Sequence, residues 1–177
     1  LPIAKHKTEV SSYGLRQVSV KRPAQLPWVV MGYNVPTLAQ LSKNDQWQAY
    51  ALYLAAALLS EDSSGRLAQH LVRQSSLAAD ASAWYSLAHR YYSLWVIEAT
   101  PAKGQTITAV QKGLLDEVHL LQSELVSSSE LARIKQQVIA ANTFSKNSLE
   151  DEATMLGEAE MSGVSWQEVM AFNQRIQ

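Results

Sequence analysis

The 177-residue chain carries 15 basic and 16 acidic side chains, a near balance that excludes the positive field typical of domains that bind nucleic acid or anionic membranes. Hydrophobic residues make up 47% of the chain, enough for one core without covalent staples. Cysteine is absent, which excludes disulfides, thiolate zinc sites and a cysteine nucleophile. No apolar run reaches the roughly 18 residues that a membrane-spanning helix needs. We therefore expect no nucleic acid partner and no membrane segment.

The first residues are polar and aperiodic, and we interpret residues 1–12 as a linker before a single domain over residues 13–177. The chain does not begin with methionine, so we expect it to be a fragment or processed form of a longer protein. Its N-terminus lacks the apolar core of a signal peptide. The sequence leaves the compartment unknown.

Four segments have the patterns of β-strands. Residues 15–21 alternate with period two, which predicts a half-buried strand. Residues 28–35 are apolar on both faces at their start, which predicts a central strand that ends before Pro36. Residues 79–87 and 92–97 alternate again, and their short connection predicts antiparallel pairing.

Helical patterns fill the remainder. Residues 46–60 are apolar nearly all round, which predicts a buried helix capped by Asn44 or Asp45. A short helix with Leu67 and Leu71 on one side follows. After residue 106 the period becomes helical throughout, with start signals at Ser127, Ser148 and Ser165 and a stop signal at Gly163.

The order of these elements predicts an α+β fold, with an antiparallel sheet of about four strands and about six helices packed on one face. The chain has no βαβαβ alternation and no glycine-rich phosphate loop, and both absences argue against nucleotide binding.

A search for chemistry finds little. The four histidines, His6, His70, His89 and His119, form no HxxH, HxxEH or HExxH motif. Asp116 lies three residues before His119, but a solvated helix face explains that pair better than a metal site. We expect His70 to point to solvent. The serine clusters are explained by helix caps, so we predict no catalytic residue and no metal ligand in this chain.

Arg66 and Arg73 lie seven residues apart, two turns of one α-helix, and are therefore expected on the same side. The simpler interpretation is that they are solvated or pair with Glu61 or Asp62. The functional interpretation is that one of them faces a peptide or a partner domain, where a guanidinium holds a carbonyl or carboxylate.

Several segments together resemble one family. These are GYNVP at 32–36, SSGRL at 63–67, LVRQ at 71–74, LAADASAWY at 77–85, WVIEATP at 95–101, SELARIK at 129–135 and LGEAE at 156–160. In this order and spacing they resemble the second, C-terminal type of domain of the insulinase/pitrilysin zinc metallopeptidases, the inverzincins, and especially their bacterial members. The resemblance covers residues from about 10 to 177.

The resemblance implies that the zinc ligands, an HxxEH helix and a distant glutamate, belong to a separate domain. It implies no cofactor in this chain, which alone is predicted to be inactive, and zinc in the other domain of the parent protein. In active members an arginine followed seven residues later by a tyrosine helps to hold the substrate. Arg73 matches that arginine, whereas Asp80 replaces the tyrosine. Arg73 and Asp80 are therefore the candidate substrate-binding residues.

Our first hypothesis is a non-catalytic domain of a zinc-dependent endopeptidase that packs against a zinc-bearing domain and helps to enclose peptide substrate. The alternative is a structural subunit of an inactive family member without proteolysis. A third interpretation is an unrelated α+β ligand-binding module. An HxxEH motif encoded upstream would favour the first hypothesis over the second. Bacterial relatives are often exported, so periplasmic or membrane-associated export of the parent stays an open alternative.

Overall fold

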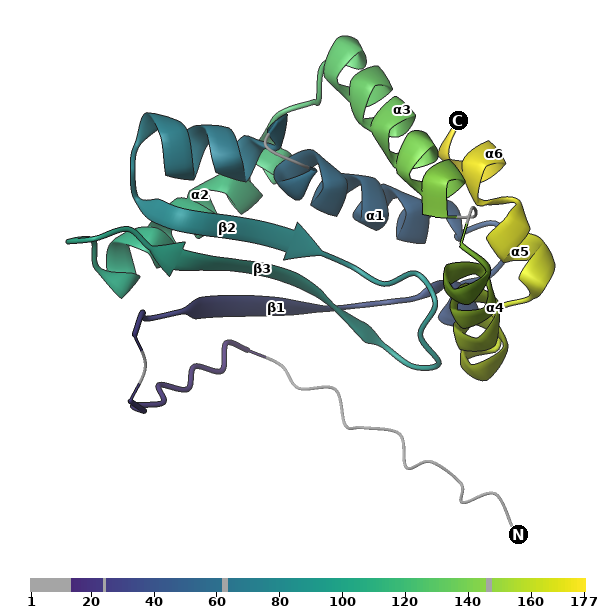
Figure 1. Ribbon diagram of the computed structural model, residues 1–177, viewed down its shortest axis with the longest axis horizontal. Helices are drawn as coiled ribbons and strands as arrows, with labels where there is room; N and C mark the ends of the chain where they lie inside the picture. The colour runs from purple at the N-terminus through teal and green to yellow at the C-terminus, as the bar shows by residue number, and fades with distance from the viewer. Residues whose placement is uncertain (1–13, 24, 62–63, 146–147) are drawn as a thin grey trace, which may run out of the picture.

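The computed structural model describes residues 14–23, 25–61, 64–145 and 148–177. Within these ranges the chain forms two layers, a β-sheet and a cover of helices (Figure 1). The strands are β1 (Val29–Val35), β2 (Ala78–Trp84) and β3 (Ser93–Pro101). The helical elements are η1 (Leu38–Gln40), α1 (Trp47–Ser60), η3 (Ala68–Gln74), α2 (Ile107–Ser123), α3 (Ser128–Ser145), α4 (Leu149–Ser162), α5 (Trp166–Met170) and α6 (Phe172–Ile176).

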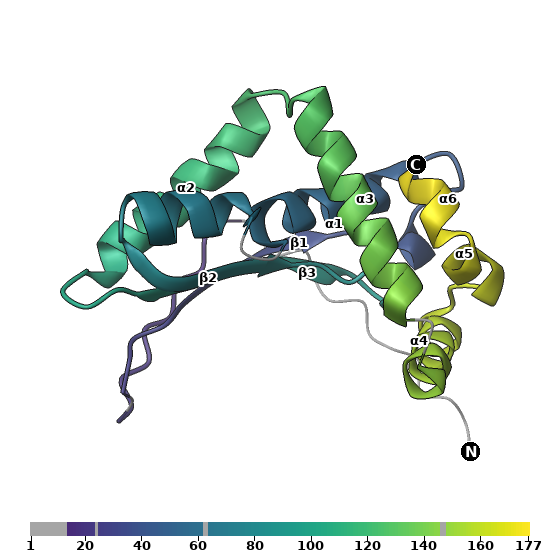
Figure 2. The same cartoon turned by 45° about the horizontal axis from the view of Figure 1, so that its top comes forward.

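The predicted α+β class and antiparallel pairing are confirmed. The sheet order is β1-β3-β2, and β3 pairs antiparallel with both neighbours. Figure 2 shows α1, α2, α3 and η3 on one side of the sheet. No described helix covers the central part of the opposite side, which we call the open face. The described residues therefore form a one-sided sheet.

The expected fourth strand is not found. Residues 15–21 form no strand, and the apolar side chains of Leu15, Val18 and Val20 are 90%, 84% and 72% exposed. A period-two pattern gives a strand only where a neighbouring strand pairs with it and a core covers one face. Among the described residues nothing provides this, so the sheet has three strands. The predicted linker, residues 1–12, lies outside the described residues.

The segment predicted as the central strand is an edge strand. β1 pairs only with β3 within the described sheet, and Val30 in it is 47% exposed. β3 takes the centre because it follows β2 closely in the chain and has hydrogen-bonding edges toward both neighbours. The apolar start of β1 reflects burial of Val29 and partial burial of Met31 under the helices.

A β-bulge between Ala78 and Asp80 breaks the alternation predicted for residues 79–87. Ala78, before the bulge, and Ala83 and Tyr85, after it, are all buried. A bulge adds one residue to a strand and reverses which positions face the core. Ala79 was therefore expected on the inner face but is exposed.

The predicted helix starts and stop agree with the structure at four places. The hydroxyls of Ser127, Ser148 and Ser165 each accept a hydrogen bond from a backbone N–H three residues later, at 3.2, 3.2 and 3.3 Å. Gly163 ends α4 in the left-handed region, with a φ of 81°. The cap predicted for α1 is wrong, because its N-cap is Gln46 and Asp45 instead accepts a hydrogen bond from Ser42.

The core lies between β3 and the helix layer. Along β3, Ser93, Trp95, Ile97 and Ala99 are buried toward the helices, and the indole Nε1 of Trp95 donates to the Leu52 carbonyl of α1 at 3.0 Å. The predicted burial of α1 holds for most of its length, as Leu59 shows with 0% exposure, but Trp47 at its start is 65% exposed. None of the described helices combines the length and apolarity needed to cross a bilayer.

Candidate functional site

The segment that carries Arg66, His70 and Arg73 is a π-helix over most of its length. The N–H of Ser75 donates to the carbonyl of His70, five residues earlier, at 3.1 Å. Leu67 and Leu71 are buried, as their spacing predicted. A π-helix turns less per residue than an α-helix, so a seven-residue spacing no longer returns to the same side. The two arginines accordingly contact different parts of the fold.

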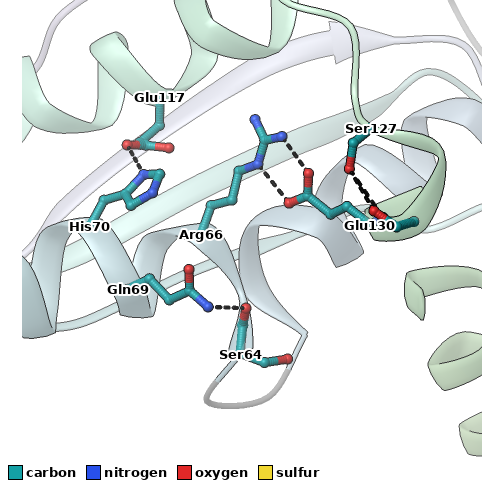
Figure 3. A network of polar contacts seen from close by, with 8 residues as sticks. Ser64, Arg66, Gln69, His70, Glu117, Ser127 and Glu130 are labelled. Carbon is teal, nitrogen blue, oxygen red and sulfur yellow. Dashed lines mark hydrogen bonds and ion pairs between the residues drawn. The ribbon is translucent and has the colours of Figure 1, made fainter. Parts of the chain in front are cut away.

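Arg66 forms a two-bond ion pair with Glu130 at the start of α3 (Figure 3). Its Nε and Nη2 donate to Oε1 and Oε2 at 3.0 and 2.7 Å, and the two side chains are 16% and 24% exposed. The expected partners were Glu61 and Asp62; Asp62 lies outside the described residues. Because a planar guanidinium matches a carboxylate, this pair fixes η3 against α3.

The ion pair makes stability depend on pH. The hydrogen bond from Arg66 lowers the pKa of Glu130 below its ordinary value of about 4.5. The folded state therefore binds fewer protons at this group than the unfolded state. The stabilisation is present above pH 4.5 and is lost as the pH falls through the lower folded-state pKa.

We expect Glu130→Gln to reduce the free energy of unfolding at pH 7 by about 1–2 kcal/mol, because one charge-assisted pair is lost at a partly exposed site. The loss should shrink at pH 3, where the wild-type carboxylate is increasingly protonated. Urea denaturation at both pH values measures this. Glu160→Gln, at an exposed position of α4, is the control, with an expected change within about 0.5 kcal/mol. Equal losses for Glu130→Gln at pH 7 and pH 3 would contradict the proposed origin of the effect.

His70 does not point to solvent as expected. Its Nδ1 lies 2.7 Å from Oε1 of Glu117, a residue of α2 that is only 4% exposed (Figure 3). The other oxygen, Oε2, has no hydrogen-bond partner among the described residues. Together, Arg66 and His70 tie η3 to α3 and α2, so this polar network has a structural explanation.

The structure gives the Asp116–His119 pair no role in metal binding. Asp116 instead pairs with Lys112 at 2.8 Å on the exposed side of α2. Among the described residues, no group of three or more histidine, aspartate or glutamate side chains is placed to hold a metal ion.

Arg73 and Asp80, the two predicted substrate-binding residues, line the same hollow. It has a volume of about 540 Å³ and lies between η3, the end of α1 and β2. Ser60 and Ser82 also line it. Asp80 directly follows the bulge, which turns its side chain away from the core. The hollow therefore joins a cation, a carboxylate and hydroxyls beside an edge strand.

Sequence reasoning missed Glu117 and Glu130 as partners of the η3 side chains. Glu117 is 47 residues from His70, and Glu130 is 64 residues from Arg66. Glu130 was noted only as part of a capping box. Charge alone could not distinguish these two glutamates from the other acidic residues of the helices.

The model of the Peptidase M16 inactive domain matches residues 2–138. The chain belongs to this family. The match includes the sheet, η3 and α2, and therefore Arg73 and Asp80. The resemblance to the non-zinc domain of the insulinase/pitrilysin peptidases is thereby confirmed. No curated protein matched the sequence.

Solved structures from bacteria share the fold. A protease from Helicobacter pylori superposes with a TM-score of 0.74 at 24% identity, over 86% of this chain and 35% of that one. The inactive peptidase domain of a "putative zinc protease" from Bordetella parapertussis gives 0.72 at 24% identity, over 90% and 82%. A "putative zinc protease" from Bordetella pertussis Tohama I gives 0.69 at 23%, over 84% and 78%. The M16 inactive-domain chain thus spans about a third of the Helicobacter protease.

Proposed function

We propose that this M16 inactive domain packs against a zinc-bearing domain and helps to enclose peptide substrate in a zinc-dependent endopeptidase. Hydrolysis would use a metal-activated water and a glutamate base, both supplied from outside this chain. Family membership supports the non-catalytic role. The observation that carries the enclosure is the open face, because a one-sided sheet presents a broad surface that a partner or a substrate is able to cover.

The open face carries apolar side chains at its centre. Trp84, Leu94 and Val30, one from each strand, are 51%, 46% and 47% exposed. They surround Val96, which is paired with Gly32 and Trp84 across the strands and is only 3% exposed. An exposed group of large apolar residues on a sheet favours contact with another macromolecule or with a peptide.

The hollow with Arg73 adds a polar position at the edge of this sheet. β2 is an edge strand of the described sheet, and an edge strand has backbone groups that an extended peptide is able to pair with. The Arg73 guanidinium would hold a carbonyl or the terminal carboxylate of such a peptide. Asp80 beside it would favour a peptide that presents a donor, such as an amide N–H or a basic side chain.

The test is reconstitution with the zinc-bearing domain of the parent protein, using a quenched fluorescent peptide. We expect peptide cleavage only with both parts present, and Arg73→Ala should lower kcat/KM roughly tenfold, as loss of one hydrogen bond to a charged group predicts. Arg90→Ala, in the exposed connection between β2 and β3, is the matched control and should leave kcat/KM unchanged. Zinc-dependent cleavage by the isolated chain would contradict the proposal.

Asp80 favours a second candidate, the structural subunit of an inactive family member. A carboxylate beside Arg73 competes with a substrate carboxylate for the guanidinium. If the parent gene encodes no HxxEH motif, or if Arg73→Ala and Arg90→Ala behave alike in the reconstituted enzyme, the structural role is favoured.

A further inference from the structure

A second cavity lies in the helix layer, at the end where α1 meets α4, α5 and α6. Its volume is about 380 Å³. Aromatic rings from three elements line it: Tyr50 and Tyr53 of α1, Tyr85 just after β2, and Phe172 of α6. Phe172 meets Tyr53 edge-on, with ring centroids 5.4 Å apart, and Tyr50 at 6.2 Å. The cavity therefore has the apolar, aromatic wall typical of a small-ligand site.

The charged side chains of its lining are acidic. Glu158 of α4 and Glu168 of α5 line the cavity, and none of the described lining residues is basic. Glu168 also accepts a hydrogen bond from Arg175 at 3.2 Å, which holds the carboxylate in place, but Arg175 is not part of the lining. Carboxylates next to aromatic faces attract cations and repel anions.

One buried polar group in this wall has no partner. The hydroxyl of Tyr50 makes no hydrogen bond to any described residue, although Tyr50 is only 5% exposed. Burial raises the pKa of Tyr50, and the charge of Glu168 raises it further, so the hydroxyl lies within the field of that carboxylate. By contrast, the hydroxyl of Tyr85 donates to the carbonyl of Pro36 at 2.6 Å. A buried hydroxyl without a partner is costly, which indicates that a ligand or water group belongs there.

We propose that this cavity binds an organic cation on an apolar stem, an alkylammonium or alkylguanidinium group, with the stem among the rings of Tyr50, Tyr53 and Phe172 and the cationic head toward Glu158 and Glu168. The head would also provide contacts near the unpartnered Tyr50 hydroxyl. The same chemistry is found in a free amine and in the lysine or arginine side chain of a peptide. The site is built from residues of this chain alone and does not depend on the zinc-bearing domain.

Titration of the full chain with three probes of similar length tests the charge preference. The probes are n-butylammonium, 1-pentanol and pentanoate, with binding followed by NMR chemical shifts. We expect n-butylammonium to bind at least tenfold more tightly than either of the others, with the largest shifts at Tyr50, Tyr53 and Phe172. Equal binding of pentanoate, or absence of n-butylammonium binding, would overturn the proposal.

Two variants locate the site. Glu158→Gln removes an exposed lining carboxylate and should weaken n-butylammonium binding about threefold to tenfold without unfolding the chain. Glu160→Gln, two residues further along α4 and outside the lining, is the matched control and should leave binding unchanged. Equal effects of the two substitutions would assign the binding to general surface charge and would overturn the proposal.

A further pair of probes identifies the source of the cation. A capped Ala-Lys-Ala tripeptide is compared with its norleucine analogue and with n-butylammonium. Tighter binding of the lysine peptide than of n-butylammonium identifies a peptide side chain, whereas binding of n-butylammonium alone identifies a free amine. Either result supports the cation site. Failure of the reconstituted peptidase assay would leave this result unaffected, so the two proposals fail separately.

Discussion

Replacement of Trp95 by alanine is expected to reduce the free energy of unfolding by about 3–5 kcal/mol. Trp95 lies in the central strand, is 6% exposed and packs at 6.1 Å from the ring of Tyr33. Its indole N–H satisfies the Leu52 carbonyl at 3.0 Å. The substitution therefore creates a cavity and removes a buried hydrogen bond between the sheet and α1. Urea denaturation followed by far-UV circular dichroism measures the loss.

Trp84→Ala is the matched control. Trp84 lies one strand away and faces the open side, where it is 51% exposed. We expect a loss of about 1 kcal/mol, because half of its surface is already in contact with water. If the two tryptophan substitutions destabilise the chain equally, the helix layer does not cover the face described here.

Replacement of Gly65 by alanine is expected to cost about 1–3 kcal/mol. A Cβ at this position would lie 2.5 Å from the carbonyl oxygen of Leu59 and 2.9 Å from its carbonyl carbon. Both atoms are backbone atoms of α1, so no side-chain rotation relieves the contact. The end of α1 or the start of η3 must move, and with η3 the Arg66–Glu130 pair. Thermal unfolding measures the loss of stability.

Gly157→Ala gives the opposite expectation. Gly157 lies inside α4, and a Cβ there would meet no atom within 4 Å. Alanine has the higher helix propensity, so we expect a gain of roughly 0.5–1 kcal/mol. Stabilisation by alanine at both glycines would contradict the close approach of α1 and η3.

The sequence predicted those features that depend on neighbouring residues. The caps at Ser148 and Ser165 bond to N–H groups three residues away, and the spacing of Leu67 and Leu71 places both on one side of a single helical segment. Such interactions are present in any chain with the same local letters. The α+β class followed because the period of the apolar residues changes where strands give way to helices.

The candidate site was predictable in one part only. Arg73 was found because its segment resembles a family, and the structure places it with Asp80 in one hollow, although whether they contact a substrate stays a prediction. The partners of Arg66 and His70 were not predictable. Each is an acidic residue on a distant helix, and many equivalent acidic residues occur along α2, α3 and α4.

The sequence by itself therefore determined the type of each main element, most of the helix caps and the family. Only the tertiary structure decided that β3 is the central strand and that residues 15–21 form no strand. It also decided that η3 turns Arg66 and Arg73 toward different neighbours. The physical reason is range. Capping bonds and helical periods act over three to five residues, whereas strand order and buried ion pairs depend on contacts between segments that meet only after the chain has folded.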